Sequence, residues 1–262
     1  MISCINLLGG NNMNQTQDFT KGVIWKQLLF FFFPILIGSF FQQLYNTVDT
    51  IIVGQAVGTS ALAAVGSTGN LTSLIVNFYV GLSTGASVVI AQYYGAQNDK
   101  KIHQAVHTSY TLAIVSGILM MLFDLFFSYQ CLDAIGTPHD ILNDATLYMQ
   151  LYFLCMIPGA IYNIGAGILR AVGDSKRPLY YLIVCSIVNV VFDFIFVVIF
   201  HQGIAGAAIA TVIAQFVCAI LVTIQLMRTN EVYKLTLSKM KFHLPVLKKI
   251  IMIGAPAGIQ ST

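Results

Sequence analysis

An aspartate follows a hydrophobic run that is long enough to cross a lipid bilayer. The 22 residues from Gln27 to Val48 carry no charge, and a membrane-spanning helix needs about 20 apolar residues. Asp49 comes next, and residues 50–53 are apolar enough to continue the helix past it. A carboxylate at that depth costs about 2.5–3.5 kcal/mol on insertion scales, so it usually faces the protein interior or a watery cavity. We therefore expect the Asp49 side chain to face other helices or a water-filled space.

Three further polar residues share the face of the helix on which Asp49 lies. Gln42, Tyr45 and Asn46 stand seven, four and three positions before it, and these spacings place side chains on one side of a helix. This polar stripe favours a cavity-lining role, with Gln42, Tyr45 and Asn46 as candidate substrate contacts. The alternative is a hydrogen-bonded seam between two helices that binds no ligand.

The composition is that of a polytopic membrane protein. Hydrophobic residues make up 57% of the chain and charged residues 9%, against about 25% charged residues in soluble proteins. The basic residues follow the membrane topology described below, so they do not indicate a nucleic-acid partner. The five cysteines are scattered and form no Cys-x-x-Cys pair, so we interpret them as small hydrophobic residues and expect neither a disulfide framework nor a zinc site. They are Cys4, Cys131, Cys155, Cys185 and Cys218.

Six long apolar segments follow one another, and a seventh begins near the end of the chain. In hydrocarbon only helices satisfy the backbone of an open-ended segment, so an all-α fold is expected. The second segment contains Gly81-x-x-x-Gly85, a pattern that permits close helix contact. The six predicted spans cover residues 24–53, 61–94, 102–127, 145–169, 178–200 and 203–227, and the seventh starts near residue 247.

This segmentation divides the chain into four parts. Residues 1–23 form a polar tail, in which Met13 is an alternative start, and residues 24–229 form a lobe of six transmembrane helices. Residues 230–246 form a basic linker, and residues 247–262 begin the seventh helix.

The positions of the basic residues predict the orientation of the helices. All 13 Lys and Arg residues lie before or in the first turn of the first span, in the connections after the second, fourth and sixth spans, or in the first turn of the seventh. Cytoplasmic connections are enriched in Lys and Arg. We therefore expect a multi-pass protein of the plasma or inner membrane, with the N-terminus and the 230–246 linker in the cytoplasm.

An internal match predicts a second lobe. Residues 25–27 are followed by Pro34, and residues 247–249 are followed by Pro256, with nine residues from start to proline in both copies. Six helices separate the copies, so the two repeats would run parallel about an axis along the membrane normal. We expect the chain to be an N-terminal lobe plus the opening of a truncated C-terminal lobe.

Five oxygen-bearing side chains on four predicted helices are candidates for one cation site. Asn189 lies four residues before Asp193 on one helical face, and both are surrounded by apolar residues. Carboxylate, amide and hydroxyl oxygens are the ligands that hard cations prefer. Two buried carboxylates cannot both stay charged cheaply, so either Na⁺ bridges them or one of them binds H⁺. The five residues are Asp49, Asn163, Asn189, Asp193 and Thr211.

Other motifs indicate less. The third acid within the spans, Asp124, lies near the outer end of the third span and is expected to reach the interface. His103 and His107 have helical spacing but lack a third ligand nearby in sequence, which favours a role other than metal binding. The sequence contains no phosphate loop, nucleophile elbow or His-Glu-x-x-His motif, so an enzyme is not expected.

The chain resembles the multidrug and toxic compound extrusion (MATE) family, in its DinF-like branch. The resemblance begins after residue 18 and rests on segments that are matched together. These are Pro34, residues 42–50 with 53–54, residues 58–66, residues 91–96, residues 167–174 leading to Pro178, the Asn189-x-x-x-Asp193 pair, and residues 206–211.

The resemblance implies a fold, a set of roles and a function. It implies a twelve-helix fold of two lobes, of which this chain covers about six and a half helices, and it places Pro34 where family members bend the first helix. It implies that the five oxygen-bearing residues bind the coupling cation and that no cofactor is needed. The expected function is antiport, with Na⁺ or H⁺ moving in and amphipathic, often cationic, organic compounds moving out. The alternatives are a lipid-linked oligosaccharide flippase of the same superfamily and a membrane fragment that does not transport.

Overall fold

The computed structural model describes residues 24–56, 59–134 and 136–260, and the described part contains helices and connections but no strands. The long helices are α2 (Ile24–Ala56), α3 (Thr59–Gly95), α4 (Asp99–Ala134), α5 (His139–Phe153), α6 (Met156–Ala171), α7 (Lys176–Asp193), α8 (Gly203–Arg228) and α9 (Leu244–Gln260). A π-helical turn, η1 (Phe194–Ile199), extends α7, and a short 3-10 turn, η2 (Leu237–Lys239), lies in the linker before α9. The all-α fold class predicted from the sequence is confirmed.

Four helical segments in the described part are long and apolar enough to cross a membrane. They are Thr72–Gly95, Asp99–Ala134, Lys176–Ile199 and Gly203–Arg228, and α5 with α6 makes a fifth if the bent pair counts as one span. Within α2, Leu28–Leu44 is a shorter apolar helix. The second to sixth predicted spans overlap these four helices and the bent pair, while the first overlaps the shorter apolar helix within α2. Helix α9 begins near the predicted start of the seventh.

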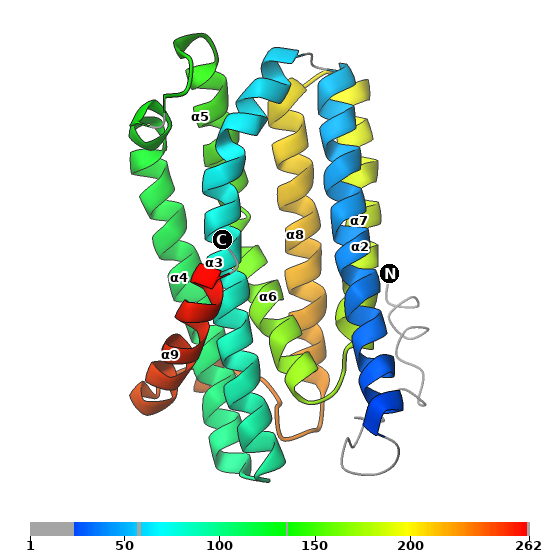
Figure 1. Cartoon of the computed structure of the whole chain (residues 1–262), viewed down its shortest axis with the longest axis vertical. Coiled ribbons are helices and arrows are strands. Elements are labelled where there is room, and N and C mark those ends of the chain that lie inside the picture. Colours follow the sequence, from blue (N-terminus) through cyan, green and yellow to red (C-terminus); the bar gives the residue numbers. More distant parts are fainter. Residues whose placement is uncertain (1–23, 57–58, 135, 261–262) are drawn as a thin grey trace.

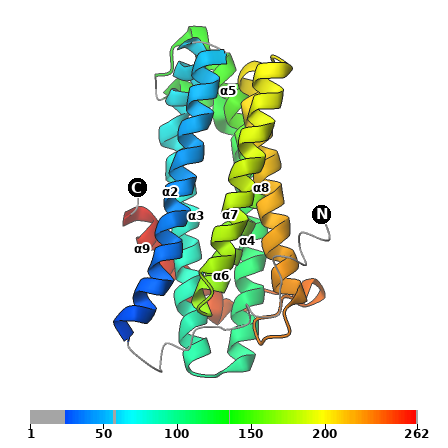
Figure 2. The ribbon, with the colours of Figure 1, turned by 90° about the vertical axis from the view of Figure 1, so that its right-hand side faces the viewer.

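The helices form an upright bundle in which α2 runs along α7 and α9 packs across α3 (Figure 1). The main hydrophobic core lies among α3, α4, α5, α6 and α8, and it continues into the start of α9. Many large apolar side chains of α2 are exposed, including Trp25, Phe30 and Phe33. In Figure 2, which looks at the right-hand side of Figure 1, α2 and α7 lie toward the viewer, and α4 and α9 lie behind them.

The predicted fourth span is a bent pair of helices. The axes of α5 and α6 meet at 44°. Pro158 stands in the first turn of α6 and has no N–H to donate to the carbonyl of Leu154, four residues earlier. The chain turns there through shorter bonds, in which the Leu154 and Cys155 amides donate to carbonyls three residues back. This bend directs the lower part of α6 into the bundle, toward α3 and α8.

Glycines bring the backbones of α3 and α9 into contact. A methyl group added at Gly81 would overlap the backbone of Gly258, and one added at Gly85 would overlap the backbone of Ile250 and Gly254. The close contact predicted from the Gly81-x-x-x-Gly85 pattern is therefore present, and α9 is its partner. Small residues are the usual means of close helix packing in hydrocarbon.

Hydrogen bonds join the linker before α9 to side chains near the beginning of α4. The backbone N–H of Thr236 donates to His107 Nε2 at 3.1 Å, and His107 Nδ1 lies 2.7 Å from the His103 carbonyl oxygen. His107 therefore accepts a bond from the linker through Nε2 and donates a bond to its own helix through Nδ1. The His243 N–H donates to Thr108 Oγ1 at 3.2 Å.

A substitution in the glycine contact should release α9. Gly85→Ala places a methyl group against α9, and overpacking of this kind costs about 1–3 kcal/mol. Amide hydrogen exchange in residues 250–258 should rise about tenfold or more, because 1.4 kcal/mol corresponds to a factor of ten. Gly69→Ala is the matched control, since no atom of another described helix lies within 4 Å of the new methyl group. Equal exchange in the two variants would contradict the close contact.

Candidate functional site: a polar cavity between α2, α6, α7 and α8

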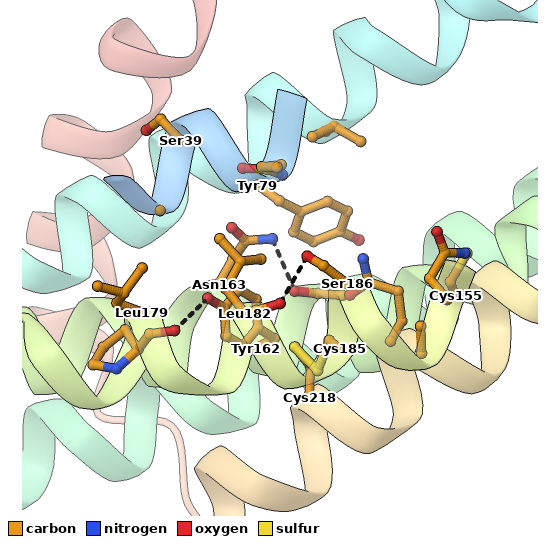
Figure 3. A pocket seen from close by; sticks show the side chains of 18 of the residues that line it. Ser39, Tyr79, Cys155, Tyr162, Asn163, Leu179, Leu182, Cys185, Ser186 and Cys218 are labelled. Carbon is orange, nitrogen blue, oxygen red and sulfur yellow. Dashed lines mark hydrogen bonds between the residues drawn. A yellow bond between two sulfur atoms is a disulfide. The ribbon is translucent and has the colours of Figure 1, made fainter. Parts of the chain in front are cut away.

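A cavity of about 150 Å³ lies between the helices. Side chains from α2, α3, α6, α7 and α8 converge on it, and Figure 3 shows Tyr79, Asn163 and Ser186 around the same space. Its polar lining residues include Ser39, Gln42, Tyr79, Tyr162, Asn163, Arg170, Ser175, Ser186, Asn189, Thr211 and Gln215. The volume corresponds to several water molecules, since one water occupies about 30 Å³ of liquid.

Five of the predicted site residues line this one cavity. Pro34 and Gln42 contribute from α2, and Asn163, Asn189 and Thr211 contribute from α6, α7 and α8. The cavity therefore brings together residues that are up to 177 positions apart in the sequence. The side chains of Asp49, Tyr45 and Asn46 lie outside the described part of the structure, although helix α2 carries all three positions.

Asp193 is buried at the end of α7, one helical turn beyond Asn189. Its exposed fraction is 0% and that of Asn189 is 1%, so the expected common face of the two residues is turned into the protein. The π-helical turn η1 begins at the next residue, Phe194. Such turns are rare and are found frequently at functional sites.

Two residues that line the cavity have a side-chain amide oxygen without a hydrogen-bond partner in the described part of the chain. Asn189 Nδ2 donates to Thr211 Oγ1 at 3.4 Å, and Thr211 Oγ1 donates to the Ala207 carbonyl at 3.1 Å. Asn189 Oδ1 is buried and has no hydrogen-bond partner among the described residues, and the same holds for Gln215 Oε1. Two unpaired acceptors at the cavity therefore come from helices α7 and α8, and Asn189 lies one helical turn before Asp193.

Asn163 is held by its own helix. Its Nδ2 atom donates to the Gly159 carbonyl at 2.9 Å, and its backbone carbonyl accepts a bond from Ser83 Oγ of α3 at 2.6 Å. The amide nitrogen is thus used within α6, which leaves the amide oxygen as the acceptor that it can offer. Among the described residues no group of three His, Cys, Asp or Glu side chains could hold a metal ion, so a cation here would depend on amide and hydroxyl oxygens beside the carboxylates.

The sequence analysis missed several polar residues of the cavity, among them Gln215, Tyr79 and Arg170. Gln215 lies four residues after Thr211 on α8, so its helical spacing is a signal that could have identified it. Tyr79 comes from α3, where no polar stripe pointed to it. Arg170 stands in the last turn of α6, and the position at the end of a span hid its contact with the cavity.

The cysteines require a correction. The sequence analysis expected no disulfide, but Cys185 of α7 and Cys218 of α8 are disulfide-bonded, with Cα atoms 5.8 Å apart, and both line the cavity (Figure 3). The two residues are almost equally far from the α7–α8 connection near His201. In two antiparallel neighbours this symmetry places residues at the same height, which is a signal that motif spacing alone did not provide.

Asp124 also differs from expectation. It was expected to reach the membrane interface, but its exposed fraction is 1%. The residue lies on the inward face of α4, together with Gly117, which contacts Ile157 of α6. Position near the end of a span therefore did not predict exposure, because α4 packs against both α5 and α6.

The disulfide gives a direct prediction. Cys185 and Cys218 should resist alkylation in the unfolded, unreduced protein and should appear as one linked peptide pair, whereas Cys131 and Cys155 should be alkylated without reduction. A chain-entropy estimate for a loop of 33 residues gives about 3–4 kcal/mol of stabilisation. Reduction should therefore lower the melting temperature, and equal labelling of all four cysteines before reduction would contradict the pairing.

Comparison with known proteins places the chain in a family. A sequence profile of the MatE family matches residues 34–195. The chain is 28% identical over 251 residues to a probable multidrug resistance protein of Bacillus subtilis, YoeA, covering 93% of this chain and 54% of that protein. It also resembles crystal structures of MATE in a bent and in a straight conformation, each with a TM-score of 0.83, 27% identity, and coverage of 89% of this chain and 52% of the other.

The chain spans about half the length of the relatives that it matches. The family profile covers more than half of the chain, and the matched region includes Pro34, Gln42, Asn163, Asn189 and Asp193. The helices that carry these residues have the arrangement of MATE structures. The chain belongs to the MATE family of membrane transporters.

Proposed function

We propose that this chain forms the cation-coupling lobe of a multidrug antiporter. Relatives of about twice its matched length are named as multidrug resistance proteins, which supports export of organic compounds as the function of the two-lobe transporter. Inward movement of Na⁺ or H⁺ would drive the export. The observation that carries the proposal is the unpaired amide oxygen of Asn189, one turn from the fully buried Asp193.

An unpaired acceptor in this position favours a bound cation. A buried polar atom without a partner costs about 1–3 kcal/mol, and a cation or a protonated group that supplied the partner would recover that cost. In this proposal Asn189 Oδ1 and the Asp193 carboxylate bind Na⁺ directly. Thr211 Oγ1 and Asn163 Oδ1 are further oxygen ligands, and both residues line the cavity together with Asn189. In the proposed site Asp49 of α2 completes the shell.

Competition between H⁺ and Na⁺ follows from the same chemistry. When Asp193 or Asp49 is protonated, a carboxyl O–H can donate to a neighbouring acceptor, which removes a negative ligand that Na⁺ needs. Either ion would therefore stabilise one packing of α7 and α8 against α2 over another, and this difference in affinity is the source of coupling.

Helix α2 is the proposed moving element. Pro34 and Gln42 of α2 line the cavity together with Asn189, so a bend at Pro34 would change the cavity wall directly. Most large apolar side chains of α2 are exposed, so few core contacts oppose such a bend. We assign Gln42, Tyr45 and Asn46 to contacts with amphipathic, often cationic, substrates. In the proposed orientation the N-terminus and the linker before α9 lie on the cytoplasmic side of the plasma membrane.

A second candidate function is supported by one specific contact. Arg170 lines the cavity, and a cationic lining suits an anionic substrate such as a lipid-linked oligosaccharide. Under this alternative, replacing Arg170 would abolish transport of an anionic substrate, while the same substitution would leave export of a cationic dye unchanged.

The cation site is tested by removing its charge without changing its shape. Asp193→Asn and Asp49→Asn, each in the assembled two-lobe transporter, should abolish Na⁺- or H⁺-driven export of a cationic dye from proteoliposomes while membrane insertion stays normal. Asp133→Asn, which changes an exposed acid, is the matched control and should export at the wild-type rate. Dye export by Asp193→Asn that still depends on the ion gradient, at equal protein level, would refute the assignment.

A milder variant tests the unpaired oxygen itself. Asn189→Ser shortens the side chain and withdraws the amide oxygen, so the coupling ion should bind more weakly. The concentration of ion that gives half-maximal export should rise about tenfold, since a typical hydrogen bond to a charged group contributes about 1.5–3 kcal/mol. Half-maximal export at the wild-type ion concentration would show that Asn189 is not a ligand.

A further inference from the structure

A second buried acid lies on α4, away from the cavity described above. Asp124, Ser128 and Leu132 are spaced by four residues on one face of α4, and their exposed fractions are 1%, 2% and 0%. The Thr137 N–H donates to the Leu132 carbonyl at 3.1 Å, which places this buried threonine at the end of the same stripe. The stripe runs toward the end of the bundle where α4 meets α5 (Figure 1).

The polar atoms of this stripe lack partners in the described part of the chain. Both carboxylate oxygens of Asp124, Ser128 Oγ and Thr137 Oγ1 are buried without a hydrogen bond. Other hydroxyls in this region do find a partner within their helix, since Ser116 donates to the Leu112 carbonyl and Thr146 to the Leu142 carbonyl. Ser128 makes no such bond. Buried polar groups normally bond to protein or to ordered water. The side chains of this stripe are therefore suited to hold a chain of ordered water molecules.

The surroundings of Asp124 disfavour a charged carboxylate. Residues 102–169, which include all of α5 and nearly all of α4 and α6, contain no Lys or Arg. On α4 itself the next ionisable residues are the exposed Tyr129 and the partly exposed Cys131. The closest acidic or basic residues near this end are Asp133 and His139, both exposed, and Asp140 and Asp144, whose side chains lie outside the described part. The helices packed against α4 carry phenols at Tyr79, Tyr93 and Tyr94 of α3, Tyr148 and Tyr152 of α5, and Tyr162 of α6. An isolated carboxylate buried without a partner is costly, so the group takes up a proton instead.

We propose that Asp124 is a proton-binding site, separate from the cavity, which exchanges its proton with bulk water through Ser128 and Thr137. The reaction is the transfer of a proton from hydronium to the carboxylate, giving a neutral carboxylic acid and water. One carboxyl group and two hydroxyls offer few ligands for a metal cation, whereas a proton needs one oxygen and an acceptor beyond it. In the orientation expected from the Lys and Arg residues, this chain of water molecules meets bulk water on the side away from the cytoplasm. The proposal does not rest on the cation site of α7 and α8.

Infrared spectroscopy of the purified protein at neutral pH tests whether Asp124 is protonated. The wild-type spectrum should contain a band of a protonated carboxylic acid that shifts in D₂O, and Asp124→Asn should lose this component. Asp133→Asn, an exposed acid nine residues further on, should retain it, and Asp193→Asn should retain it as well. Loss of the band in Asp193→Asn alone would overturn the proposal and leave the cation site standing, and so would a band that Asp124→Asn leaves unchanged.

The exchange rate of this band tests the path. Thr137→Val removes one hydroxyl at nearly constant volume and should slow deuterium exchange of the carboxyl group about tenfold. Thr146→Val is the matched control, because the Thr146 hydroxyl is already bonded to Leu142 within α5. Equal rates in the two variants would overturn the path, and a carboxylate spectrum that responds to Na⁺ would overturn proton binding. The deuterium-exchange and Na⁺ measurements leave Asp124 itself unchanged, so they test proton binding and its path even if Asp124→Asn fails to fold.

Discussion

The burial of polar side chains in an apolar bundle is the constraint on which this structure depends. A carboxyl group with no exposed surface, such as that of Asp193, is tolerated only where hydrogen-bond donors, a cation or a bound proton offset its charge. The packing of α7 against α8 gives one neighbouring polar group a partner, because the Asn189 amide, one turn before Asp193, donates to Thr211 of α8. The amide oxygens of Asn189 and Gln215 remain without a partner in the described part of the chain, so they are available to bind a ligand.

The arrangement of the helices follows from where the chain can make close contacts. Glycines allow α3 and α9 to touch through their backbones, while Pro158 bends the α5–α6 pair so that α6 enters the centre of the bundle. Helix α2 has neither kind of anchor in the core and packs mainly along α7. A helix that is held along one neighbour can move relative to the cavity at a lower cost than a helix of the core, which agrees with the role proposed for Pro34.

The sequence predicted the helices well because each one must bury about 20 apolar residues, a pattern that needs no tertiary information. The shared buried face of Asn189 and Asp193 was also predictable, since helical spacing alone places the two residues on one side of α7. The disulfide between Cys185 and Cys218, the burial of Asp124 and the contribution of Tyr79 were not found, because each depends on which helix lies next to which. The bend within the fourth span was hidden as well, since hydropathy reads continuously across Leu154 and Cys155.

The central claim is that the Asn189 amide oxygen contributes to a site for one exchangeable cation. The most direct test is a high-resolution structure of the protein in a lipid environment at high Na⁺ and again at low pH without Na⁺. The account predicts a single ion, or a protonated Asp193 with its hydrogen-bonded partner, within bonding distance of Asn189 Oδ1 or the carboxyl group. Asn189 Oδ1 bonded only to protein groups under both conditions, with no change around Asp193, would contradict it.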